Sequence, residues 1–126
     1  MINLIPLPDN YSIYQLRLNQ KIPTHIFDSG FYSITKTNDE ISIVTNSNAD
    51  LENTKSEKDW KGFKVEGMLD FSLVGIINAI TKPLMDNKIS IFVISTFNTD
   101  YIFVKRESFK TSIEIFKKTG TINIKD

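Results

Sequence analysis

The side chains best suited to binding a ligand lie in a short polar segment between two strongly apolar runs. The runs are Ile89–Ile94 and Tyr101–Val104, and both are rich in β-branched and aromatic residues, which is typical of buried strands. The segment between them, Ser95-Thr-Phe-Asn-Thr-Asp100, supplies hydroxyls, an amide and a carboxylate but contains no glycine or proline. A hairpin turn that serves only geometry would commonly use Asn-Gly or Asp-Gly. We therefore take this segment, the hairpin tip, as the first candidate for a functional site.

Few other residues offer reactive chemistry. The chain has no cysteine, which excludes disulfides, thiolate metal sites and cysteine nucleophiles. His25 is the only histidine, so an imidazole metal site has no second ligand, and we expect His25 to be structural or exposed. No nucleophile elbow is present, and the glycines at 62, 67 and 75 do not fit a dinucleotide fingerprint. The acidic pair Asp39-Glu40 is expected in a solvated turn. We predict no catalytic residues, no metal and no cofactor.

Charge and composition limit the classes of partner that we expect this chain to bind. The chain carries 15 basic and 15 acidic residues, with 40% hydrophobic and 24% charged residues, as in ordinary soluble globular proteins. This balance, with Arg17 and Arg106 as the only arginines, gives no electrostatic basis for binding nucleic acid or an anionic membrane. The N-terminus lacks the features of a signal peptide, and no apolar run approaches the ~20 residues that span a bilayer. We expect a cytoplasmic protein.

The first half of the chain predicts strands at residues 11–16, 31–37 and 41–45, with a short helical turn near 23–27. Residues 1–10 contain Pro6 and Pro8 and are expected to form an extended lead-in that ends in a turn. From Asn46 to Asp59 the apolar content collapses, which predicts either a mobile loop or a short helix. This polar stretch is the one plausible internal boundary.

The second half predicts the order strand, helix, strand, strand, helix, strand, which is the βαββαβ plan of ferredoxin-like folds. The strands are expected at 60–65, at the two apolar runs and at 121–124, and the second helix at 107–118. Pro83 should end or kink the first helix near Thr81. Two amphipathic helices would then cover one face of a four-stranded antiparallel sheet. The apolar positions of the first helix are Leu73, Ile76, Ile77, Ile80 and Leu84, and Asp70 or Ser72 could cap it.

Two stretches of this half resemble ACT-domain proteins of the CASTOR-like type, which are small tandem-ACT proteins of bacteria. They are Asp70-Phe-Ser-Leu-Val-Gly-Ile76 and Ile89–Ile102, with Ile94-Ser-Thr-x-x-Thr-Asp-Tyr101 as the most specific element. The first half is similar in pattern at Phe31-Tyr-Ser-Ile-Thr and Asp39-Glu-Ile-Ser-Ile-Val44. The resemblance implies an α+β, ferredoxin-like protein of two tandem ACT-like βαββαβ units, the first one degenerate, at residues 1–58 and 59–126.

The resemblance also implies an amino-acid ligand held between ACT units and no catalysis. The free amides at the start of the first helix of the second half could meet the ligand carboxylate, and Gly75 would allow a close approach. Asp100 would then pair with the ammonium group. An alternative reading is that Asp100 only caps its own turn and that Gly75 only serves helix–sheet contact. The full set of expected ligand-binding residues is Asp70, Leu73, Val74, Gly75, Ile76, Ser95, Thr96, Phe97, Thr99 and Asp100.

Two functions of different kinds follow. The first is a non-catalytic sensor or regulatory protein that binds a small molecule, most simply an amino acid. The second is a structural or protein-interaction module without a ligand, which forms a homodimer through its ACT units. An open sheet edge would invite such pairing.

Overall fold

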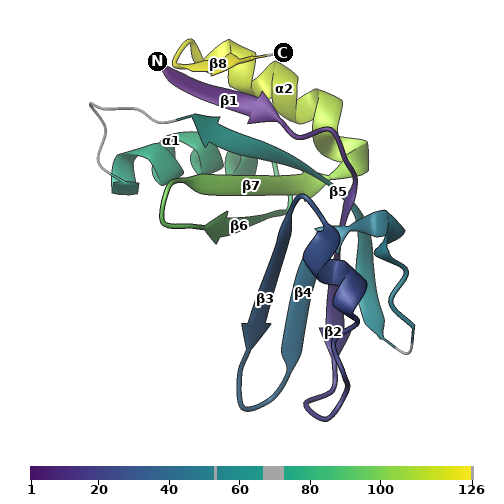
Figure 1. Ribbon diagram of the computed structural model, residues 1–126. Helices are drawn as coiled ribbons and strands as arrows, with labels where there is room; N and C mark the ends of the chain where they lie inside the picture. The colour runs from purple at the N-terminus through teal and green to yellow at the C-terminus, as the bar shows by residue number, and fades with distance from the viewer. Residues whose placement is uncertain (53, 67–72, 126) are drawn as a thin grey trace. The chain divides into compact units, whose positions relative to one another are not determined.

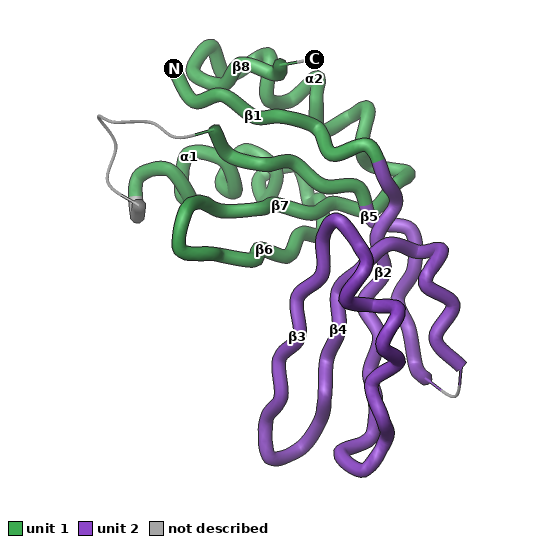
Figure 2. The backbone as a smooth tube through the Cα atoms, in the orientation of Figure 1, with its two compact units in different colours: residues 1–8, 61–126 green, residues 9–60 purple. Residues whose placement is uncertain are grey.

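The computed structural model describes residues 1–52, 54–66 and 73–125, and for residues 73 and 74 it describes the backbone alone (Figure 1). The chain divides into two compact units, shown in Figure 2. Unit 1 comprises residues 1–8 and 61–126, and unit 2 comprises residues 9–60. The units differ from the expected halves, 1–58 and 59–126, mainly in the first eight residues, which group with the second half.

Unit 1 confirms the α+β, ferredoxin-like plan. Its strands follow the spatial order β6-β7-β5-β1-β8, and the two helices α1 and α2 lie on one face of this sheet (Figure 1). Alternate residues of the strands and one face of each helix form the core between these layers. The bounds are β1 Ile2–Pro6, β5 Lys55–Glu66, α1 Leu73–Asp86, β6 Ile91–Ser95, β7 Asp100–Lys105, the short 3₁₀ helix η3 Arg106–Ser108, α2 Phe109–Thr119 and β8 Ile122–Ile124.

The first strand of the chain refines the expectation of an extended lead-in, because this segment pairs within the sheet. β1 lies between β5 and β8, antiparallel to β5 and parallel to β8, so the sheet has five strands rather than four. Ile2 and Leu4 are 1% and 0% exposed, because their alternation with Asn3 turns both side chains toward the helices. Pro6 ends this strand and Pro8 lies beyond it, where a missing N–H is tolerated.

Helix α1 also departs from its expected end. It runs through Pro83 to Asp86 as one element, although proline removes one helical hydrogen bond and costs ~3 kcal/mol in a helix interior. Ile80 and Leu84 flank Pro83 and are both 0% exposed in the core of unit 1. Burying two large aliphatic side chains contributes about 1.5–3 kcal/mol each, which is enough to offset the proline. Core burial therefore outweighs the local penalty.

Unit 2 has the strand order β3-β4-β2-β5, with short 3₁₀ helices in place of α-helices. A small core forms on one face of this sheet, and the buried residues are Tyr14, Leu16, Ile26, Ile41, Ile43 and Leu51. The single-turn helix η1 supplies Ile26 to this core, which fits a degenerate ACT-like unit. The bounds are β2 Tyr11–Leu16, η1 Thr24–Asp28, β3 Tyr32–Lys36, β4 Ile41–Asn46 and η2 Ser47–Ala49, followed by residues 55–60 of β5.

The polar stretch from Asn46 to Asp59 is not a single loop. It contains η2 and the first residues of β5, which begins at Lys55 rather than near Trp60. Residues 55–58 are all exposed, and within unit 2 they pair with β2 alone. A charged edge strand of this kind lacks the apolar alternation by which strands are recognised, and its charges discourage pairing with other chains.

Gly62 in β5 is expected to be intolerant of a side chain. A Cβ atom added there would lie 2.8 Å from Leu7 Cδ1 and 2.8 Å from Phe103 Cε1, and Phe103 is fully buried. Gly62→Ala should therefore lower the free energy of unfolding by about 1–3 kcal/mol, the usual cost of overpacking. Gly30→Ala is the matched control, because a Cβ there meets nothing within 4 Å. Urea denaturation of both variants measures the difference, and equal midpoints would contradict the close approach at Gly62.

Candidate functional site

The hairpin tip between β6 and β7 is closed by threonine hydroxyls. The Thr96 N–H donates to the Thr99 carbonyl at 2.8 Å, and the Thr96 hydroxyl donates to the same oxygen at 2.9 Å. In return, the Thr99 N–H donates to Thr96 Oγ1 at 3.2 Å. These three bonds close a two-residue turn at Phe97-Asn98 and explain how the tip turns without glycine. Part of the polar character noted in the sequence therefore serves the turn itself.

Thr99 also ties the tip to the neighbouring strand. Its hydroxyl donates to the Val65 carbonyl at 2.6 Å, one residue before β5 ends. The end of β5 and the beginning of β7 therefore lie at the same edge of the unit 1 sheet. Helix α1 follows β5 in the chain and begins at that edge (Figure 1). The fold thus brings the hairpin tip and the start of α1 to one edge, which we call the β5–α1 edge.

Asp100 is the buried charge at this edge. It opens β7 opposite Ser95, and the residue is 6% exposed. Among the described residues its carboxylate accepts no hydrogen bond, while Thr96 and Thr99 close the turn. The structure therefore does not give Asp100 the turn-capping role. The Asp100 oxygens are not among the fully buried polar atoms that lack a partner, so the carboxylate can be reached by an ammonium donor that forms a charge-assisted hydrogen bond with it.

The remaining expected ligand residues divide into four groups. Ile76 is 6% exposed and packs into the core of unit 1, so its side chain serves stability. Phe97 is fully exposed, and Ser95 and Thr96 are also exposed, so their side chains face solvent at the tip. Gly75 is half-buried near the start of α1. Leu73 and Val74 begin α1 with only their backbone described, and Asp70 lies outside the described residues.

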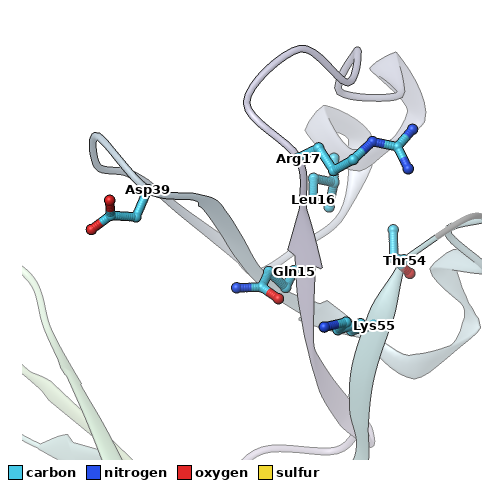
Figure 3. Close-up of a pocket in the computed structure, with 6 residues that line it drawn as sticks. All are labelled: Gln15, Leu16, Arg17, Asp39, Thr54 and Lys55. Atoms are coloured by element: carbon cyan, nitrogen blue, oxygen red, sulfur yellow. The ribbon is translucent and has the colours of Figure 1, made fainter.

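Unit 2 holds a surface pocket that the sequence did not suggest. Its volume is about 500 Å³, and it lies where β2 ends and β5 begins (Figure 3). Its lining residues are Gln15, Leu16, Arg17, Asp39, Thr54 and Lys55. The one sign of this pocket in the sequence was the scarcity of arginine, since Arg17 is one of only two arginines in the chain. A neighbouring depression of about 430 Å³ shares Gln15 and Lys55 with this pocket.

His25 has a structural role. Its Nε2 lies 2.8 Å from the Ala49 carbonyl oxygen, which links η1 to η2 within unit 2. The ring is exposed, so His25 is both structural and exposed, as expected. Among residues 1–52, 54–66 and 73–125, no three histidine or acidic side chains are grouped closely enough to hold a metal ion. None of the helices in the described chain is both long enough and apolar enough to cross a membrane.

Comparison with known families identifies the family to which this fold belongs. A family model described as an ACT domain matches residues 55–118, which is half of the chain. The chain belongs to the ACT domain family. A second model, described as the N-terminal domain of a group of related proteins, matches residues 9–49. The N-terminal match lies within unit 2, whereas the match of the ACT protein to the ACT model begins with β5 at Lys55, so its first six residues belong to unit 2 and the rest to unit 1.

Solved structures agree with this assignment. The chain is 31% identical to protein Atu0741 of Agobacterium tumefaciens, with a TM-score of 0.89 over 99% of this chain and 94% of that one. It is 15% identical to the Vibrio cholerae protein VC0802, described as of unknown function and a possible transport protein, with a TM-score of 0.71 over 90% of this chain and 86% of that one. A search of curated protein sequences found no match.

The fold is also that of regulatory domains of aspartate kinase. The ligand-free regulatory subunit of the Thermus thermophilus enzyme is 11% identical, with a TM-score of 0.61 over 87% of this chain and 92% of that one. At this identity the likeness concerns the fold alone. The ACT protein therefore shares an architecture with regulatory domains, while its own ligand must be argued from its own residues.

Proposed function

We propose that this ACT protein is a non-catalytic sensor or regulatory protein that binds an amino acid at the β5–α1 edge of unit 1. Asp100 carries the proposal, because this residue is only 6% exposed at this edge and its carboxylate accepts no hydrogen bond from the described chain. An ammonium group supplies both the charge and the donors that such a carboxylate lacks. The start of α1 lies at the same edge, where the positive end of the helix dipole favours the ligand carboxylate.

We infer further that the protein is of the CASTOR-like, tandem-ACT type and works in the cytoplasm. Two observations support the tandem organisation. The ACT model and the N-terminal domain model match successive parts of the chain, and unit 2 has a strand–helical turn–strand–strand order followed by β5. The regulatory name of the aspartate kinase subunit belongs to that protein, but its shared fold makes a regulatory use of this one reasonable.

A thermal-shift screen of the twenty amino acids tests the proposal. A ligand present at 100 times its dissociation constant adds about 2.7 kcal/mol of stability, which raises the melting temperature of a domain of this size by several degrees. Asp100→Asn keeps the side-chain shape and removes the charge, so it should abolish most of the shift at the same ligand concentration. Losing a charge-assisted hydrogen bond of about 1.5–3 kcal/mol weakens binding by roughly tenfold or more.

Asp86→Asn is the matched control. Asp86 also lies in unit 1, but its carboxylate is exposed and pairs with Lys82 at 2.8 Å on the surface of α1. It should leave the ligand-induced shift unchanged. If no amino acid moves the melting temperature, the amino-acid sensor is wrong and the ligand-free interaction module takes its place. If an amino acid binds Asp100→Asn as tightly as the natural chain, the site lies elsewhere.

A further inference from the structure

We propose that the 500 Å³ pocket of unit 2 is a second binding site, for a small anion that carries a carboxylate or phosphate group. It is independent of the proposed amino-acid site, which lies in unit 1. Its volume falls within the range of about 300–1,000 Å³ that is usual for small-molecule sites, so the anionic group would belong to a metabolite rather than to a bare ion.

Two cationic side chains flank the pocket. Lys55 is the first residue of β5 and is paired across the strands with Gln15 of β2. Arg17 follows directly after β2, two residues beyond Gln15. Within the described chain neither the Arg17 guanidinium nor the Lys55 ammonium has an ion-pair partner. Both cations are therefore available to an incoming anion, and the planar fork of arginine suits carboxylate and phosphate oxygens.

Hydrogen bonds hold the two walls of the pocket together. The Arg17 N–H donates to Gln20 Oε1 at 3.3 Å, and the Gln20 N–H donates to the Arg17 carbonyl at 3.0 Å. The Gln20 side-chain amide then donates to the Glu52 carbonyl at 3.3 Å, which connects the end of β2 to the segment before β5. Leu16 is 1% exposed and anchors this wall in the core of unit 2. The backbone at both cations is thereby fixed before any ligand binds.

Glu57 of β5, two residues after Lys55, lines the neighbouring depression rather than this pocket, and two further acidic residues lie on the β3–β4 turn. Asp39 lies on the β3–β4 turn, and in Figure 3 its carboxylate points away from Arg17 and Lys55. Glu40 on the same turn accepts a hydrogen bond from Gln15 Nε2 at 3.3 Å. A compact anion at Arg17 and Lys55 avoids these acids, whereas a long polyanion would extend over them. We therefore expect a small ligand and no nucleic acid.

Titration of the full chain, followed by amide NMR shifts at low ionic strength, tests the site. Inorganic phosphate and succinate are the two probes, and the one that binds more tightly identifies the anionic group. We expect saturable shifts at Gln15, Arg17, Thr54 and Lys55. Arg17→Gln and Lys55→Gln should each weaken binding about tenfold, because each removes one charge-assisted contact. Added salt should weaken binding as well.

Matched variants separate this site from general charge effects and from the proposed function. Arg106→Gln removes the other arginine, and Lys36→Gln removes another exposed strand lysine of unit 2. Both should leave the affinity for the probe unchanged, as should Asp100→Asn. The proposal is overturned if neither probe gives saturable shifts at these residues. It is also overturned if the Arg17→Gln, Lys55→Gln double variant binds like the natural chain.

Discussion

Replacing Phe63 with alanine should lower the free energy of unfolding by about 3–5 kcal/mol, the largest effect that we expect from a single substitution in this protein. Phe63 is 0% exposed. Its ring stacks on Phe109 with centroids 5.2 Å apart and meets the edge of Phe116 at 5.4 Å. The alanine would leave a cavity where β5 meets α2 and would also remove two aromatic contacts of about 0.5–1.5 kcal/mol each. Urea denaturation followed by circular dichroism measures the loss.

Phe97→Ala is the control for this substitution. It removes the same side chain from the hairpin tip, where Phe97 is fully exposed and contributes no burial. Its effect on the free energy of unfolding should stay within about 0.5 kcal/mol, as is usual for surface positions. If Phe97→Ala destabilised the protein as much as Phe63→Ala, the assignment of the core of unit 1 would be wrong.

The second large effect is expected in unit 2. Leu16→Ala should cost about 2–5 kcal/mol, because Leu16 is 1% exposed and packs with Tyr14, Ile26 and Ile41 in a core of few residues. Within this range the cost depends on how far the small core can collapse around the cavity. Amide hydrogen exchange measures it, as lost protection in β2 and β4.

Leu18→Ala provides the comparison two residues further along. Leu18 is 45% exposed beyond the end of β2, so its truncation should change protection little. Similar losses for the two leucine variants would mean that protection of β2 and β4 does not depend on the burial of Leu16. Leu16 also lines the unit 2 pocket, so binding of the anionic probe to Leu16→Ala reports on the state of unit 2. We expect weaker binding only if the substitution loosens unit 2.

The proposed sites rely on different kinds of residue. At the β5–α1 edge, the threonines of the tip are used within the protein, and the buried Asp100 is left for the ligand. In the unit 2 pocket, two exposed cations are held on a tied backbone. Both sites pair opposite charges, but Asp100 is nearly buried whereas Arg17 and Lys55 are exposed, so salt should affect the anion site more strongly.

Much of the fold could be predicted from the sequence, because the signal lies in local periodicity. Ile76, Ile80 and Leu84 recur at helical spacing and form the buried face of α1. The apolar runs around residues 89–105 form the β6–β7 hairpin, and Gly120 follows α2 with a φ of 73°, a conformation that favours glycine. These features depend on residues that are close in the chain, so the sequence alone determined the ACT plan of unit 1.

Tertiary structure decided the features that depend on contacts between residues far apart in the sequence. Ile2 and Leu4 form a strand only because β5 and β8 provide hydrogen-bonding neighbours about 60 and 120 residues away. Pro83 is tolerated because the side chains around it are buried, and the charged start of β5 is a strand because β2 pairs with it. Arg17 and Lys55 likewise line one pocket because strand register pairs Lys55 with Gln15, not because they are close in the sequence. Local pattern fixed the elements, and long-range pairing placed the residues that could bind a ligand.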